Sequence, residues 1–309
     1  MSYMPKTYRK DGGDTMVVAA GGKIEVESGG AIIFPNPSGG GDYYVDNNAG
    51  VDATGDGLSW ATAWKTLATA ITAVNARTGS SNYAARCRIF YKADSETVNL
   101  AALPQKTDII GVGSCDAYPM ASIKGNHAPL TEKFGCRFFN VRFIPATADI
   151  LWTLIANNNG VKFYGCQFVG SQDAITATSA ISTTATELLD VIDCDFDGAF
   201  SADVIAIGAG NASGLKIIGN NIRGAANDGI VIDTGATYTS VNSVPIIKGN
   251  LISVAGCTIK DVPENALVVD NDLISQAATG TASLDINIRF ASRNWIEDAT
   301  KGAPYPAAH

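Results

Sequence analysis

The stretches CRFFNVRF (136–143), VKFYGCQF (161–168) and LDVIDCDF (189–196) decide the fold of this 309-residue chain, because they repeat one short pattern. The pattern returns as LKIIGNNI (215–222), PIIKGNLI (245–252) and ALVVDNDL (266–273). Each stretch has apolar side chains three residues before and two residues after one aligned position. Alternation of apolar with other residues on both sides of a bend is typical of short strands that turn around a core.

The aligned positions recur at intervals of 21 to 30 residues, each long enough for two or three short strands; they are Val141, Cys166, Cys194, Asn220, Asn250, Asn271 and, less clearly, Asn294. Such a period is the signature of a solenoid, in which each coil buries its apolar side against its neighbours. A sandwich or a jelly roll would not require a repeated template. The sequence therefore predicts an all-β fold, a right-handed parallel β-helix.

Three asparagines occupy the aligned position in successive coils. We expect Asn220, Asn250 and Asn271 to stack as an amide ladder in which each side chain hydrogen-bonds its neighbour and the turn backbone. The alternative is that the three are independent turn residues.

Composition excludes several classes of protein. The formal net charge is -8 and the 22 basic residues are scattered, which disfavours nucleic-acid binding. No run of about 18 apolar residues predicts a membrane span, and no secretion signal opens the chain. The six cysteines form no CxxC pair, so we expect reduced thiols and no zinc site, in keeping with synthesis in a cytoplasm.

The chain is predicted to have two parts. Residues 1–41 form an N-terminal arm that ends in the Pro- and Gly-rich joint PNPSGGG (35–41), and residues 42–309 form the β-helix domain. Consecutive Pro and Gly residues favour turns and leave the backbone free, so the joint separates the two parts.

A motif follows the joint. The segment YYVD…GxDxxGDGLSWATAWKTLATA, within residues 43–70, resembles the opening of many pectate-lyase-like β-helix proteins, including phage tailspikes and surface proteins. In it Leu67, Ile71 and Val74 have helical spacing, which predicts a short helix that caps the first coil. Asp46, Asp52 and Asp56 depart from the order of an EF-hand loop, so we expect turn residues and not a calcium site.

The arm carries a second resemblance. The segment YRKDGGDTMVVAAGGKIEVESGGAI (8–32) is similar to the N-terminal segments of phage head decoration or head-fibre proteins. The resemblance implies a virion structural protein on the particle surface, bound to the major capsid protein or another virion protein. The expected attachment residues are basic or aromatic, namely Tyr3, Lys6, Tyr8, Arg9 and Lys10.

The acids are the residues to consider for catalysis, because β-helices include polysaccharide lyases and hydrolases that need paired carboxylates. The densest cluster is Asp190, Asp193, Asp195 and Asp197, of which Asp193 and Asp195 are weak catalytic candidates beside the simpler reading of a solvated acidic patch. The motifs NTD, GHG and RIK of polygalacturonases and Arg-x-Pro-x-x-Arg of pectate lyases are missing. We therefore expect no enzyme activity, no cofactor and no metal, and we expect His127 to lie in a surface loop without a role.

One outward column of the predicted coils is mostly apolar. It lies two residues before the aligned position and comprises Phe139, Tyr164, Ile192, Ile218, Lys248 and Val269. An apolar stripe of this length exceeds what a monomer usually exposes. Either neighbouring copies cover it, most simply in a homotrimer, with Phe139, Tyr164, Ile192, Ile218 and Val269 at the interface, or the chain's own flanking segments do.

Two other functions stay open at this stage. A tailspike-like receptor-binding or polysaccharide-degrading protein would use the outward acids, and aromatic residues such as Tyr164, to bind a surface glycan. A bacterial surface adhesin is less consistent with the missing secretion signal and the reduced cysteines.

Overall fold

The computed structural model describes residues 7–10, 15–18, 40–78, 85–93, 95–113, 120–130, 134–156, 158–224, 227–238, 244–256, 258–263, 266–275 and 290–298. The chain divides into two units, Met1–Pro37 and Ser38–His309, and the division falls inside the 35–41 joint.

The first unit contains one pair of antiparallel strands. β1 (Thr7–Lys10) pairs with β2 (Thr15–Val18), so that Tyr8 lies opposite Val17 and Arg9 opposite Met16. The two strands are too short to show a clear period, so the sequence does not predict them.

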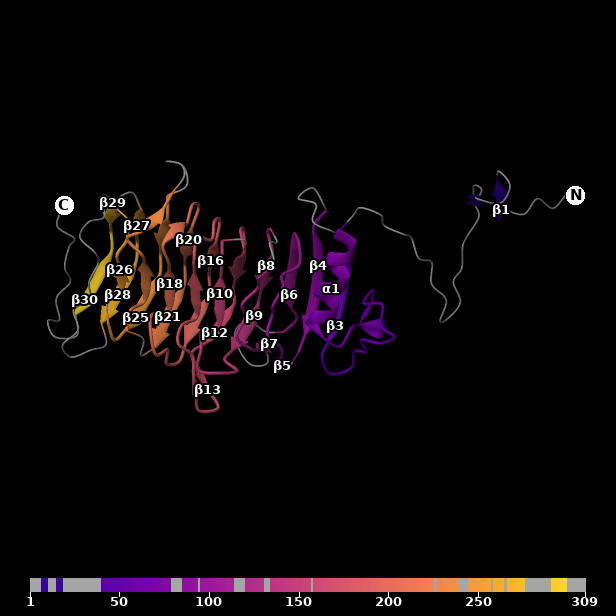
Figure 1. Ribbon diagram of the computed structural model, residues 1–309, viewed down its shortest axis with the longest axis horizontal. Coiled ribbons are helices and arrows are strands. Elements are labelled where there is room, and N and C mark those ends of the chain that lie inside the picture. The colour runs from indigo at the N-terminus through magenta and orange to yellow at the C-terminus, as the bar shows by residue number, and fades with distance from the viewer. Residues whose placement is uncertain are drawn as a thin grey trace, which may run out of the picture. The chain divides into compact units, whose positions relative to one another are not determined.

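The second unit is a parallel β-helix built from three parallel sheets, which confirms the predicted fold class (Figure 1). A typical coil runs from β15 (Ile181–Thr183) through β16 (Asp190–Ile192) and β17 (Asp195–Asp197) to β18 (Ile205–Ile207), which lies beside β15 again. From β10 to β26, each of the three sheets thus receives one strand per coil.

The ten-stranded sheet contains, in spatial order, β3 (Asp42–Asp46), β4 (Cys87–Lys92), β6 (Thr107–Gly111), β8 (Arg137–Phe139), β11 (Lys162–Tyr164), β16, β20 (Lys216–Ile218), β24 (Ile246–Lys248), β27 (Leu267–Val269) and β29 (Phe290–Ser292). The nine-stranded sheet contains β5 (Glu96–Thr97), β7 (Ala121–Lys124), β9 (Val141–Ile144), β12 (Gln167–Val169), β17, β21 (Asn221–Gly224), β25 (Leu251–Val254), β28 (Asp272–Ser275) and β30 (Trp295–Asp298). The five-stranded sheet contains β10 (Trp152–Leu154), β15, β18, β22 (Ile230–Ile232) and β26 (Ile259–Lys260). Short pairs outside these sheets are the antiparallel β13 (Ser171–Gln172) with β14 (Ile175–Thr176) and the parallel β19 (Gly210–Asn211) with β23 (Ala236–Thr237).

The interior is filled by columns of identical or similar side chains. The pairing register places Phe143, Phe168 and Phe196 on consecutive coils, and all three are fully buried. The rings of Phe168 and Phe196 stack with centroids 4.6 Å apart. The apolar positions of the repeated template are therefore the core positions, as the sequence predicted.

The bend between the ten-stranded and nine-stranded sheets has one conformation in every coil from β8 onward. The residue before each aligned position has a positive φ between 53° and 68°; these residues are Asn140, Gly165, Asp193, Gly219, Gly249, Asp270 and Arg293. Gly and Asn or Asp adopt this left-handed conformation most readily, which explains their frequency there.

The predicted amide ladder is confirmed and includes a fourth asparagine. The side-chain nitrogen of Asn220 donates to Asn250 Oδ1 at 2.9 Å, Asn250 donates to Asn271 at 2.8 Å, and Asn271 donates to Asn294 at 2.9 Å. Each Oδ1 also accepts the backbone N–H of the preceding coil, as Asn250 Oδ1 does from Asn220 at 3.0 Å. Since all four side chains are buried, the ladder satisfies polar backbone groups that water does not reach.

Two cysteines continue this column in the earlier coils. Cys194 Sγ donates to the carbonyl of Phe163 at 3.5 Å, in the place where Asn220 donates to Val191. Cys166 does the same toward Phe138 at 3.6 Å. Cys87, Cys136, Cys166 and Cys194 are buried free thiols, as expected, whereas Cys115 and Cys257 lie outside the described residues.

Asn250→Ala is predicted to lower the free energy of unfolding by about 3 kcal/mol, because two buried N–H groups of Asn220 and the carbonyl of Ile217 lose their partner. Urea unfolding followed by circular dichroism measures the change. Cys194→Asn is the matched control: it extends the ladder by one coil and should leave stability unchanged or raise it. A destabilisation by Cys194→Asn equal to that by Asn250→Ala would contradict the ladder's role.

The helix α1 (Leu67–Thr78) connects β3 to β4 and packs on both strands, as the sequence predicted for a capping helix (Figure 1). Leu67, Ile71 and Val74 are buried in the common core. The first helical N–H, of Leu67, donates to the buried carboxylate of Glu96 at 3.0 Å. Burial raises the pKa of Glu96, and the nearby carboxylate of Asp52 adds to the rise, although the bonds from Leu67 and Tyr91 oppose it.

Glu96→Gln is predicted to keep the acceptor for Leu67 while removing the cost of a buried charge, so stability at neutral pH should stay the same or rise. Glu96→Ala should lower it by about 2 kcal/mol, because a buried helix N–H is left unsatisfied. The pKa of Glu96 is raised in the folded chain above the ordinary value of 4.5. Wild-type stability therefore falls as the pH rises from 4.5 to the raised pKa, and the advantage of the Gln variant should grow over the same interval. Thermal unfolding from about pH 4.5 upward to neutral pH measures both effects.

His127 corrects a sequence expectation, because it is fully buried and does not lie in a surface loop. Its ring lies 4.5 Å from that of Trp152, and its Nδ1 accepts the backbone N–H of Leu100 at 3.2 Å. The N–H of His127 donates to the carbonyl of Leu151, which ties the segment to the five-stranded sheet. A lone histidine between Asn126 and Ala128 gave no sign of this in the sequence, since its contacts to Leu151 and Trp152 come from the next coil.

Burial lowers the pKa of His127 to about 3, whereas an exposed histidine titrates near 6.5. Below about pH 6.5 the unfolded chain therefore binds a proton at His127 that the folded chain does not bind. The free energy of unfolding should fall by about 1.4 kcal/mol for each pH unit below about 6.5. His127→Phe should remove this part of the slope between pH 6 and pH 4.5, as measured by urea unfolding. His309→Gln, which removes the other histidine, is the control; an unchanged slope in His127→Phe would contradict the assignment.

Candidate interaction surface

The outward column predicted from sequence lies on the outer face of the ten-stranded sheet. The pairing register aligns Phe139, Tyr164, Ile192, Ile218, Lys248 and Val269 on successive strands. Phe139, Tyr164, Ile192 and Ile218 are half-buried, Lys248 is exposed and Val269 is buried. The chain itself thus covers the column at Val269 but leaves it partly open from Phe139 to Ile218.

The structure extends this column by three coils that sequence reasoning missed. Ile110 lies beside Phe139, Phe90 beside Ile110, and Tyr44 beside Phe90. All three are half-buried. They precede the repeated template, so only the alternation in DYYVD, CRIFYK and TDIIG pointed to them. We call the seven residues Tyr44, Phe90, Ile110, Phe139, Tyr164, Ile192 and Ile218 the apolar column.

The aromatic rings of the apolar column stack on one another. Phe139 and Tyr164 are 5.0 Å apart with an interplanar angle of 14°, and Tyr44 and Phe90 are 5.4 Å apart with an angle of 21°. Trp60, which is 43% exposed, meets Tyr44 edge to face at 5.0 Å. The rings therefore cover one another's faces along the column and turn their edges outward.

A column of charged residues runs beside the apolar column, two residues earlier on each strand. It comprises Asp42, Arg88, Asp108, Arg137, Lys162, Asp190 and Lys216. Neighbouring coils pair these charges: Arg88 binds Asp42 at 2.7 Å, Arg137 binds Asp108 at 2.6 Å, and Lys162 binds Asp190. We call this set the charge ladder.

The two columns also support each other. The guanidinium of Arg137 lies 5.5 Å from the ring centroid of Phe139, and that of Arg88 lies 5.9 Å from Phe90. The hydroxyl of Tyr164 donates to Asp190 at 3.2 Å, and burial together with the Asp190 carboxylate raises the pKa of Tyr164 to about 12. The surface is thus a row of ring edges beside a row of charges in which all but Lys216 form ion pairs.

The weak catalytic candidates lie around the bend that follows β16. Asp193 is exposed and holds the left-handed bend, whereas Asp195 projects from the outer face of β17. Asp195 accepts hydrogen bonds from Asn221 at 2.9 Å, Arg223 at 3.0 Å and Gln167 at 3.4 Å. Three donors from neighbouring coils engage its carboxylate, which makes Asp195 a link between coils.

A second acidic pair escaped sequence reasoning. Asp203 and Asp228 are 25 residues apart and lie on adjacent coils, where Val204 donates its N–H to the carbonyl of Asp228 at 3.0 Å. Burial and the carboxylate of Asp228 raise the pKa of Asp203. Lys260 binds Asp228 at 3.3 Å, so this pair too is part of an ion-pair network.

The aspartates of the motif after the joint cap turns, as the sequence predicted. Asp46 Oδ1 accepts the N–H groups of Asn48 and Ala49, and Asp52 Oδ1 accepts those of Lys65 and Thr66. Asp56 accepts the N–H of Leu58 at 2.9 Å. Among the residues that the structure describes, no group of three or more His, Cys, Asp or Glu side chains could hold a metal ion.

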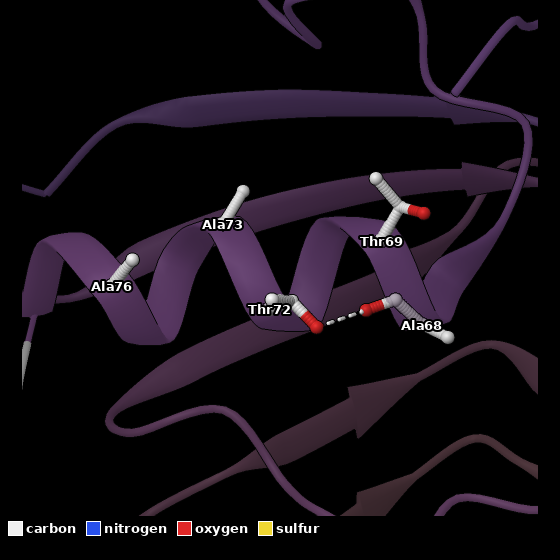
Figure 2. A pocket seen from close by; sticks show the side chains of 5 residues that line it. All are labelled: Ala68, Thr69, Thr72, Ala73 and Ala76. Atoms are coloured by element: carbon white, nitrogen blue, oxygen red, sulfur yellow. Dashed lines mark hydrogen bonds between the residues drawn. The ribbon is translucent and has the colours of Figure 1, made fainter. Parts of the chain in front are cut away.

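A depression on the outer face of α1 is lined only by small side chains, Ala68, Thr69, Thr72, Ala73 and Ala76 (Figure 2). Thr72 turns its hydroxyl to the carbonyl of Ala68 at 2.9 Å, as Figure 2 shows. The lining has no charged or titratable group, so it offers no acid or base for catalysis.

The attachment residues of the arm are only partly described. Tyr8, Arg9 and Lys10 belong to β1, whereas Tyr3 and Lys6 lie outside the described residues. Within the described parts of the chain, no helix is long and apolar enough to span a membrane.

Comparison with protein-family models, with curated proteins and with solved structures finds no match to this chain.

Proposed function

We propose that this chain is a structural protein of a tailed-phage virion, a capsid decoration or head-fibre component. Residues 1–41 attach it to the major capsid protein or another virion protein, and the β-helix stands on the particle surface as a homotrimer. The two sequence resemblances suggest this role, and the character of the solenoid supports it.

The observation that carries the proposal is that three outward acids of the solenoid join neighbouring coils. Asp108, Asp190 and Asp195 each bind donors from a neighbouring coil. A glycosidase needs a carboxylate free to donate or accept a proton at the scissile bond. Acids held in ion pairs between coils stiffen the solenoid instead, which suits a structural role.

The arm has the properties of a segment that is completed by a partner. An isolated pair of strands is at best marginally stable in water. β1 and β2 form such a pair in a unit separate from the solenoid. Addition of a strand from a capsid protein would satisfy the free edges of the pair, and Arg9 and Lys10 would add charge attraction to an acidic partner.

Deletion of residues 1–37 is predicted to leave a folded solenoid that no longer binds the particle. The measurement is co-sedimentation of the full-length and deleted proteins with purified phage heads that lack this protein. Circular dichroism and thermal unfolding check that the deleted form retains the β-helix. The full-length Arg9→Glu/Lys10→Glu variant should bind more weakly, by roughly tenfold or more.

Particle binding that survives the deletion would overturn the role of the arm. If neither form binds, the result favours the tailspike-like alternative, in which the solenoid recognises or degrades a surface glycan. Glycan binding and turnover would then be compared between wild type and an Asp193→Asn/Asp195→Asn variant.

A further inference from the structure

The apolar column is a continuous row of uncharged side chains on the outer face of the ten-stranded sheet. It crosses seven consecutive strands, from β3 to β20. At about 4.8 Å per strand it is roughly 29 Å long. Side chains in a row of this length lose little entropy on contact, because stacking and neighbouring coils already hold them half-buried.

The charges beside the column identify which partner fits. The chain has a formal net charge of -8, so two copies repel each other over most of their surfaces. The charge ladder differs, since its three aspartates face four basic residues on the same sheet. Six of its seven charges form ion pairs within one chain, and the seventh, Lys216, lies beside Asp190 in the pairing register. A second copy can therefore cover this face while Lys216 alone of the seven is left without an ion-pair partner.

The ring geometry argues against a glycan at the same place. A sugar ring packs on the exposed face of an aromatic side chain, but the faces of Phe139 and Tyr164 cover each other at 14°, as do those of Tyr44 and Phe90 at 21°. Ring edges between aliphatic side chains suit the edge-to-face and aliphatic contacts of a protein interface. Another copy of this chain offers such a surface on the same face, with an apolar row of equal length beside charges that are paired except at Lys216.

Lys248 limits how far the contact between two copies can extend along the column. It occupies the next position of the column after Ile218 and is exposed. When two copies pack with their coils level, equal positions meet, so Lys248 faces Lys248 and the like charges repel. The level arrangement therefore brings residues from Tyr44 to Ile218 together and ends before Lys248.

We propose that copies of this chain associate side by side through the outer face of the ten-stranded sheet, with coils level and the apolar column at the contact. This locates the contact between copies in the proposed virion protein, yet it requires neither the particle nor the arm.

The test is sedimentation velocity of the purified full-length protein over a concentration series. Wild type should self-associate at micromolar concentration. Ile192→Glu/Ile218→Glu should raise the dissociation constant by at least about 30-fold, since two buried contact residues become charged. Lys248→Leu should lower the dissociation constant, because it removes the repulsion and lengthens the apolar row.

Ser182→Glu is the matched control, because Ser182 is a half-buried, outward residue of β15 in the same coil as Ile192 but on the five-stranded sheet. It should associate as wild type does. Thermal unfolding confirms that each variant is folded. A monomeric wild type, an unaffected glutamate pair or an equal loss in Ser182→Glu would each overturn the proposal, whereas particle binding by the arm would be untouched by these results.

Discussion

The parallel pairing of each strand with its equivalent in the next coil is the constraint on which the rest of this structure depends. Because the register is kept from coil to coil, one residue type placed once per coil becomes a column running along the solenoid. Phenylalanines become a stacked core, asparagines become a hydrogen-bonded ladder, and outward charges become ion pairs. A shift of one residue in any coil would turn its core side chains to the surface and interrupt every column.

The same constraint explains why several acids on the outer surface are held by donors of neighbouring coils. An acid on the outside of a coil lies about 4.8 Å from the equivalent residue of its neighbours, close enough for direct hydrogen bonding. In this chain those neighbours are often Arg, Lys, Asn or Gln, as around Asp195 and Asp108. Two of the carboxylates that looked like a catalytic cluster in the sequence, Asp190 and Asp195, lie on either side of the bend at Asp193 and bind donors of other coils. A surface of this kind suits a stiff structural element.

The sequence predicted those features that repeat and missed those that do not. The core positions, the asparagine ladder and the helix at Leu67 follow from periods that can be seen in the sequence alone. Tyr44, Phe90 and Ile110 were not aligned because the first coils have only the first half of the template and lack the apolar residue two positions after the bend. Pairing nevertheless places the three residues on the same column. The burial of His127 and the pairing of Asp203 with Asp228 are contacts between coils at non-repeating positions, which no local pattern reports.

The central claim is that this β-helix belongs to a particle surface and is held there by its N-terminal residues. Cryo-electron microscopy of virions that carry the protein, compared with virions that lack it, tests this claim most directly. The account predicts additional density with three parallel sheets outside the head shell, connected to the shell through the residues that precede Ser38. Identical head surfaces in the two preparations, or solenoid density confined to the tail, would contradict it.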